Sequence, residues 1–214
     1  MTTLLLTNLV TVKMATKKHS YHHGALRDAL LEADEKIVRR DGVDALTLRA
    51  AARAAGVSHA APAHHFKDLS GLLTELAIVG FRRFRAYVER AAAEPDRKPW
   101  FGARAYVSFA IDNPGVFLLM FRSENLDSRN TALQQERISA FAMLTETRGL
   151  TGKKPTVEQL GALAASWALA HGFAMLYIDG RLKRVMNEAP PGMQVLDLLD
   201  AAYANTVYRQ EGAS

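Results

Sequence analysis

The chain has 214 residues, of which 49% are hydrophobic and 23% are charged, a composition typical of a globular protein with one or two domains. Its 27 lysine and arginine residues outnumber its 22 aspartate and glutamate residues, and the formal charge of +5 suits a polyanionic partner without requiring one. The absence of cysteine excludes disulfides and thiolate metal sites.

The N-terminal segment, residues 1–19, is expected to be a flexible arm that carries two basic residues, Lys17 and Lys18. Its apolar run is shorter than the roughly 20 residues that span a bilayer, so we expect a cytoplasmic protein. Met14 offers a second start, and we expect residues 1–13 to derive from an upstream start codon.

An amphipathic helix is predicted next, from about Ala25 to Arg40, and the pair Asp41-Gly42 is expected to end it. Apolar residues recur in it every three or four positions, as expected for one buried face. These residues are Leu26, Leu30, Ala33, Ile37 and Val38.

Residues 46–66 have the layout of two short helices joined by a tight turn, which is typical of a DNA-binding helix-turn-helix. Thr47 is expected to cap the first helix, and Gly56 to end it in a left-handed conformation. Ser58 is expected to cap the second helix, and Pro62 favours a shortened start of that helix. Because this second helix is short and rich in alanine, it suits a major groove better than a protein core.

The rest of the chain is also predicted to be helical, which gives an all-α protein. A helix capped by Asp68 or Ser70 is expected to continue to about Ala93, and a break around Pro95 and Pro99 marks the expected domain boundary. The helices predicted beyond this break cover approximately residues 100–112, 116–123, 129–148, 157–181 and 193–209.

These motifs resemble those of the tetracycline-repressor (TetR) family of transcription regulators. The similarity spans about residues 20–80 and rests on YHHGALR, on RRDGVDALTLRAAARAAGVS and on the HHF that precedes a capped helix. A weaker similarity covers the second half, where NPGVFLLMFRSEN and the set of Trp167, His171 and Gly172 resemble the subfamily with a Trp-His-Gly-type ligand domain.

The resemblance implies a homodimer joined by its last two long helices, in which each protomer places one recognition helix in the major groove of a palindromic DNA operator. It implies a three-helix DNA-binding domain at 20–68, a connecting helix at 69–94 and a ligand-binding and dimerisation domain at 95–214. A small molecule bound in the second domain would change the spacing of the two DNA-binding domains and release the operator.

The resemblance also assigns DNA contacts residue by residue. Thr47 and Arg49 would contact phosphates, and the groove would be faced by Ser58, His59, Ala60 and His64. The family usually has tyrosine in place of Ala63 and lysine in place of Leu69, so the grip on phosphates should be weaker here. Compensating phosphate contacts are expected from Lys17, Lys18 and Lys67.

A second candidate site lies in the C-terminal half, where Trp167, His171 and Met175 recur every four residues and share one helix face. They indicate either core packing around one hydrogen-bonded histidine or an apolar cavity with His171 as its polar group. In the second interpretation the cavity takes a small apolar or aromatic inducer, and its further candidates are Phe109, Phe117, Met120, Phe121 and Phe141.

The sequence gives little support for catalysis, a metal or a cofactor. Ser166 and His171 would lie about 140° apart around a helix, too far for a nucleophile–base pair. Adjacent histidines on a helix point about 100° apart, and no carboxylate or cysteine stands at ligand spacing. The leading hypothesis is therefore a ligand-responsive repressor; the alternatives are an activator or ligand-blind DNA binder, and a small-molecule carrier with weakened DNA binding.

Overall fold

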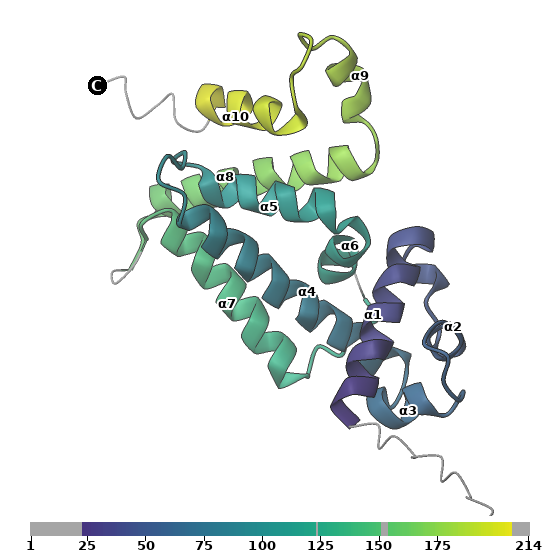
Figure 1. The fold of residues 1–214 in the computed structure, drawn as a ribbon. Helices are drawn as coiled ribbons and strands as arrows, with labels where there is room; N and C mark the ends of the chain where they lie inside the picture. Colours follow the sequence, from purple (N-terminus) through teal and green to yellow (C-terminus); the bar gives the residue numbers. More distant parts are fainter. Residues whose placement is uncertain (1–22, 123, 151–153, 207–214) are drawn as a thin grey trace, which may run out of the picture.

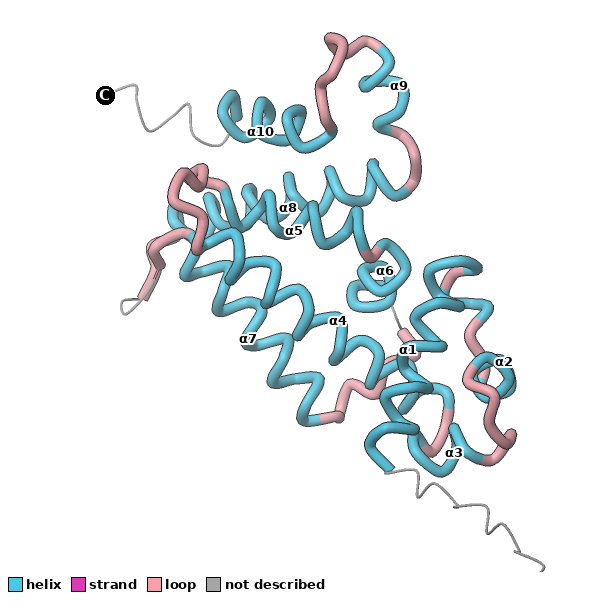
Figure 2. Tube along the Cα trace, in the orientation of Figure 1, coloured by secondary structure: helices cyan, strands magenta, loops and turns pink. Residues whose placement is uncertain are grey.

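The computed structural model describes residues 23–122, 124–150 and 154–206, and within these ranges it contains helices and no strand (Figure 1, Figure 2). The predicted all-α fold is therefore confirmed, while the predicted basic arm with Lys17 and Lys18 lies outside the described residues. In chain order the elements are α1 (His23–Asp41), the 3-10 helix η1 (Val43–Ala45), α2 (Leu48–Ala54), α3 (Ala61–Phe66), α4 (Leu69–Ala92), α5 (Phe101–Asp112), α6 (Pro114–Arg122), α7 (Thr131–Thr147), α8 (Val157–Ile178), α9 (Leu182–Asn187) and α10 (Val195–Thr206).

The helices form a small head and a larger body that share one long helix (Figure 1). The head consists of α1, η1, α2 and α3, and α4 runs from it into the body, where it packs against α5, α6 and α7. α8 lies against α5, and α10 packs on α5 as well. One continuous hydrophobic core connects the two parts, from Leu30 on α1 through Leu76 on α4 to Phe109 on α5.

The local sequence explains how the head folds. Thr47 accepts a hydrogen bond at its Oγ1 from the Ala50 N–H, at 3.1 Å, and so caps α2 as predicted. Ala51 and Ala52 on α2 are fully buried, and their small side chains allow close packing against α1 and α3. Gly56 has a φ of 66°, and this left-handed conformation ends the first helix of the motif.

The second helix of the motif begins later than its expected cap. α3 starts after Ala60 and has no side-chain cap, so the prediction that Ser58 caps it is wrong. The Ser58 carbonyl instead accepts a hydrogen bond from the Ala61 N–H, at 3.0 Å, which closes a turn before the helix. Pro62 explains the late start, because its missing N–H costs no intrahelical bond in the first turn but would cost one if Ser58 were the cap.

Several helix boundaries in the body also differ from the prediction, and two of these differences have a clear cause in the backbone. α6 begins at Pro114, two residues early, because the fixed φ of proline fits the first helical position. The single helix predicted at 157–181 is interrupted: α8 ends at Ile178, Gly180 adopts a φ of 70°, and the separate helix α9 follows. At the start of α4, Asp68 is the cap, and it accepts a hydrogen bond from the Gly71 N–H at 2.8 Å.

Asp34 on α1 is a polar residue within the core. It is 0% exposed, and neither of its carboxyl oxygens has a hydrogen-bond partner in the described part of the chain. Burial disfavours the charged carboxylate and raises the pKa of Asp34 from 3.8 to about 7. The carboxyl group therefore stays protonated in the folded protein at pH values where the unfolded chain ionises it.

This raised pKa predicts that the free energy of unfolding falls as the pH rises from 4 to 7. Over that range only the unfolded chain gains the charge, and a pKa moved from 3.8 to about 7 corresponds to about 4 kcal/mol lost above pH 7. Asp34→Asn should remove this dependence, so its stability relative to wild type should rise by that amount between pH 4 and 8 in urea unfolding followed by circular dichroism. The exposed-residue variant Asp28→Asn should track wild type, and an Asp34→Asn curve parallel to wild type would contradict the prediction.

Candidate nucleic-acid interface and ligand cavity

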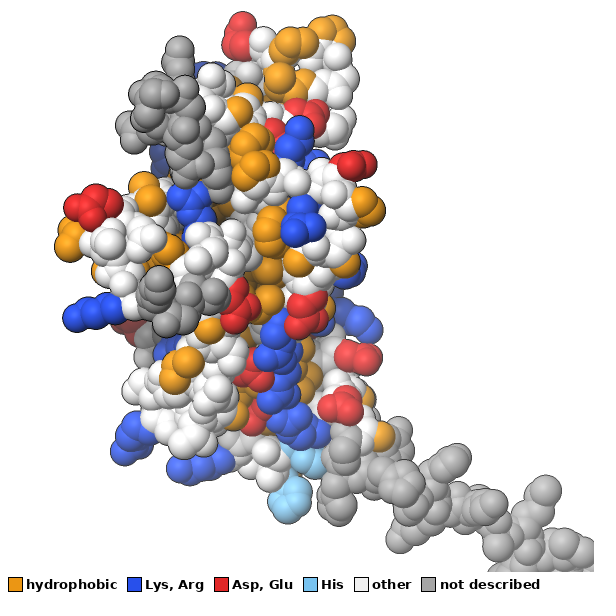
Figure 3. Space-filling model, turned by 90° about the vertical axis from the view of Figure 1, so that its left-hand side faces the viewer, with side chains coloured by type: hydrophobic (Ala, Val, Ile, Leu, Met, Phe, Trp, Pro, Cys, Tyr) orange, Lys and Arg blue, Asp and Glu red, His pale blue; other side chains and the backbone are white. Residues whose placement is uncertain are grey.

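The tip of the head carries the residues that the sequence assigned to DNA. Figure 3 shows histidine and cationic side chains gathered at this end of the molecule. Lys67 adopts a φ of 70°, rare for a residue other than glycine, where the chain turns from α3 into α4. Each assigned residue in the described part is exposed: Thr47, Arg49, Ser58, His59, Ala60, His64 and Lys67.

Close contacts fix α3 against the rest of the head. Phe66, at the end of α3, is 5% exposed, and the Arg27 guanidinium of α1 lies 5.7 Å from its ring centroid. Arg27 also forms an ion pair with Glu75 of α4. A Cβ on Gly71 would lie 2.0 Å from the Phe66 carbonyl oxygen, so only glycine allows the first turn of α4 to approach α3 this closely. The orientation of α3 therefore follows that of α1 and α4.

A polar joint connects the head to the body. Arg83 of α4 donates to both carboxylate oxygens of Glu35 on α1, at 2.5 and 2.8 Å, and to Asn113 Oδ1 between α5 and α6 at 2.9 Å. The hydrogen bond from Arg83 lowers the pKa of Glu35, which keeps this carboxylate charged. Beside it, a Cβ on Gly115 would lie 2.6 Å from the Val38 carbonyl oxygen, so α6 touches the α1 backbone directly.

The body contains an apolar cavity of about 370 Å³ between α4, α5, α6, α7 and α8. Its walls are mostly aromatic and aliphatic, as expected for a small-molecule site with few polar groups. The lining residues are Phe81, Phe84, Tyr106, Met120, Phe121, Arg137, Ala140, Phe141, Leu144 and Trp167.

Tyr106 is the polar centre of the cavity wall. Its hydroxyl lies 2.8 Å from His171 Nδ1 and also forms a hydrogen bond with the side chain of Trp167. The Trp167 indole can only donate, so the Tyr106 oxygen accepts from it while the phenolic hydrogen is free to bond His171. Burial raises the pKa of Tyr106 above its ordinary value, and the phenol therefore stays neutral.

The structure separates the predicted ligand residues into two layers. Met120, Phe121, Phe141 and Trp167 line the cavity. His171 lies behind Tyr106, 5.4 Å from Phe121 between ring centroids, and does not line the wall. The other three predicted residues also lie away from the cavity wall. Phe109 and Phe117 are buried in the core, and Met175 is half-buried against it.

Sequence reasoning missed several lining residues because they lie on helices that it read differently. Phe81 and Phe84 lie on the helix predicted at 69–94 as a connection between the two domains, and Tyr106 belongs to no recognised motif. Arg137 could have been found from the sequence, because helical spacing places this cation on the same face as Leu133 and Leu144, both of which face the body.

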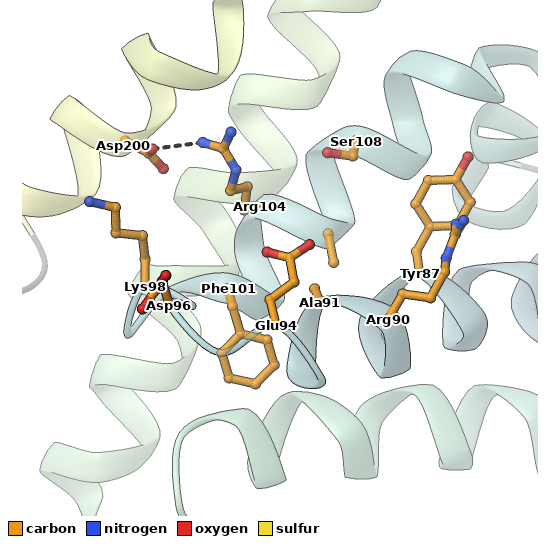
Figure 4. A pocket seen from close by; sticks show the side chains of 11 residues that line it. Tyr87, Arg90, Ala91, Glu94, Asp96, Lys98, Phe101, Arg104, Ser108 and Asp200 are labelled. Carbon is orange, nitrogen blue, oxygen red and sulfur yellow. Dashed lines mark hydrogen bonds and ion pairs between the residues drawn. The ribbon is translucent and has the colours of Figure 1, made fainter.

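A second hollow, of about 450 Å³, opens between α4, α5 and α10 and is lined largely by charged side chains (Figure 4). Within it Arg104 pairs with Asp200 at 2.6 Å, and Trp100 Nε1 donates to the same carboxylate at 2.8 Å. These bonds anchor α10 to α5. Most of its lining side chains are charged, so this hollow does not offer an apolar ligand the aromatic and aliphatic surface that the cavity offers.

Comparisons with known proteins agree with this arrangement. Residues 102–201 match the family model for the tetracyclin repressor-like C-terminal domain. The chain is 24% identical over 165 residues to the uncharacterized HTH-type transcriptional regulator YobS of Bacillus subtilis (strain 168), an alignment that covers 75% of this chain and 83% of that protein.

Two solved structures share the fold. A protein of unknown function from Rhodococcus sp. RHA1 is 33% identical, with a TM-score of 0.67 over 87% of this chain and 96% of that one. NalD, the secondary repressor of the MexAB-OprM multidrug efflux pump in Pseudomonas aeruginosa, is 21% identical, with a TM-score of 0.53 over 87% of this chain and 98% of that one.

The joint between head and body should contribute measurably to stability. A double-mutant cycle with Glu35→Ala and Arg83→Met should give a coupling energy of about 1–2 kcal/mol in urea unfolding at pH 7, because the pair is bidentate and partly buried. The lowered pKa of Glu35 means that this coupling is present above pH 4.5 and is lost as the pH falls through the folded-state pKa.

The exposed pair Arg85–Glu89, 3.9 Å apart on one face of α4, provides the control cycle. Its coupling should stay below about 0.5 kcal/mol. Equal coupling energies for the two pairs would contradict a special role for the joint.

Proposed function

We propose that the chain is a transcriptional repressor of the TetR family and that it releases a palindromic operator when a small molecule fills the cavity of its body. The coarser assignment, a DNA-binding transcriptional regulator, follows from the family. The finer assignment, a repressor controlled by a ligand, is supported by the fact that α4 is one continuous helix. Its first turn contacts α3, and its residues Phe81 and Phe84 line the cavity. We further assign the chain to the subfamily with a Trp-His-Gly-type ligand domain, since Trp167 and His171 meet at Tyr106.

The shape of the head supports insertion of α3 into a major groove. Its exposed residues are small or are histidines, and Arg49 and Lys67 stand beside it for phosphate contacts. Ala63 is exposed where the family usually has tyrosine, and Leu69 is half-buried against the core where it usually has lysine. We therefore expect Lys67 and the N-terminal arm to carry a large share of the electrostatic affinity.

We propose that α8 forms a homodimer interface, together with α10. Only four of the 22 residues of α8 are buried within the protomer, although the helix is apolar enough to span a membrane by length and composition. A stripe of small residues runs along its uncovered surface, and nothing lies within 4 Å of a Cβ added at Gly161 or Gly172. Such a stripe allows two helices to pack closely. We therefore propose that a second copy of the chain covers it, and that the protein is cytoplasmic.

Ligand control of DNA binding would pass through α4 and α6. A molecule in the cavity displaces Phe81 and Phe84 of α4 or Met120 of α6. α4 carries Arg83 of the polar joint, and α6 touches Val38 of α1 through Gly115, so a shift of either helix moves the head. In a dimer, this movement changes the distance between the two copies of α3.

The DNA-binding proposal is tested by electrophoretic mobility shift on the DNA upstream of the chain's own gene. Wild type should shift this DNA at low salt, and Ala60→Glu should weaken binding at least tenfold because it places a carboxylate against the phosphates. Ala92→Glu adds the same charge at the exposed far end of α4 and should bind as wild type does. The absence of a wild-type shift would contradict the proposal and favour a small-molecule carrier.

The dimer is tested by light scattering coupled to size-exclusion chromatography. Wild type should have twice the chain mass of 23.5 kDa. Ala168→Glu, in the exposed stripe of α8, should produce monomers because it places a charge between closely packed helices. Ala142→Glu, exposed on α7, should leave the dimer intact, and a dimeric Ala168→Glu variant would rule out this face of α8 as the interface.

A further inference from the structure

We propose that the natural ligand of the cavity is an aromatic or other apolar anion, and that Arg137 binds its carboxylate. This inference rests on the proposed ligand-responsive function and adds the charge of the ligand to it. Among the described residues that line the cavity, Arg137 is the one with an ionised side chain at neutral pH, and the others are apolar except for Tyr106.

Arg137 lies on the face of α7 that is turned toward the body of the protein. Leu133, Arg137, Ala140 and Leu144 follow each other by four, three and four residues and so share one face of α7. Leu133 is 0% exposed, and Ala140 and Leu144 line the cavity. Arg137 is half-buried on this face, so a bound ligand would desolvate the cation further, which is costly unless a partner offsets the cost.

No such partner comes from the part of the chain that the structure describes. Arg137 forms no ion pair or hydrogen bond within the described residues, although its neighbour Glu136 pairs with Arg82 at 2.7 Å and with Arg85 at 3.6 Å. By contrast, Arg83 pairs with Glu35, and Arg104 pairs with Asp200. The guanidinium of Arg137 is therefore available to bind a carboxylate through two parallel hydrogen bonds.

The remaining polar group of the wall is already satisfied. The Tyr106 hydroxyl is engaged by both His171 and Trp167, so it has little capacity left for a ligand. The aromatic rings of Phe81, Phe121 and Phe141 provide flat apolar surface for the rest of the molecule. The described lining thus combines the unpaired cation of Arg137 with aromatic walls, and an apolar carboxylate satisfies both.

The test compares three probes that share a naphthalene ring and differ in charge: 2-naphthoate, 2-naphthalenemethanol and 2-naphthylmethylamine. In isothermal titration calorimetry of the full-length protein, 2-naphthoate should bind at least tenfold more tightly than the alcohol, and the amine should bind most weakly. Arg137→Gln should bring the affinity for 2-naphthoate to within about threefold of that for the alcohol, and Arg137→Lys should keep part of the preference because it keeps the charge.

Arg129→Gln removes a cation whose side chain is 94% exposed outside the cavity, and it should bind all three probes as wild type does. An alcohol that binds as tightly as 2-naphthoate, a preference unchanged in Arg137→Gln, or no binding of any probe would each overturn the inference. Operator binding measured on the same samples keeps the proposals distinguishable. A normal mobility shift together with any of these results would refute the anionic ligand and leave the DNA-binding assignment intact.

Discussion

The structure depends on one constraint, which is that α4 belongs to both the head and the body. This helix has 24 residues and is therefore about 36 Å long, enough to reach from the end of α3 to the far side of the cavity. Its first turn is pinned to Phe66 through Gly71 and Asp68, and its middle is pinned to α1 through Arg83. Because packed helices do not deform continuously, a displacement of α4 reaches α3 as a rigid-body movement.

Polar groups in the interior have roles other than hydrophobic packing. The Glu35–Arg83–Asn113 set is fully paired and lies where three helices meet, so it specifies one orientation of the head. Tyr106 is similarly satisfied at the cavity wall. Asp34 and Arg137 are the contrasting cases, since one stays neutral through burial and the other faces an opening that a ligand can fill.

The sequence predicted the fold class and most helices because the relevant signals are local. Thr47, Gly56 and Asp68 act within one helical turn of their own positions, and a single chain is enough to recognise them. Ser58 failed as a cap because the proline four residues later competed with it, and α9 was missed because Gly180 was not read as a helix end. Where two local signals predict different helix ends, the packing of the whole chain decides which end forms.

The candidate site was less accessible to sequence reasoning. Periodicity identified Trp167 and His171 as one face of a helix, but it could not separate the wall from the layer behind it, because both layers are aromatic. Phe81, Tyr106 and Arg137 come from three different helices, and only the packing of α4, α5 and α7 brings them to one cavity. Head residues such as His59 were easier to place, since exposure at the tip follows from the motif itself.

The sparse burial of α8 has a consequence for how the protein responds to its own concentration. One face of α8 packs on α5 in its own protomer, and the proposed second copy would bury the opposite, apolar face. In the proposed homodimer, association would stabilise the folded state by mass action, and the melting temperature would rise with the protein concentration. Dilution of such a dimer would therefore lower its melting temperature.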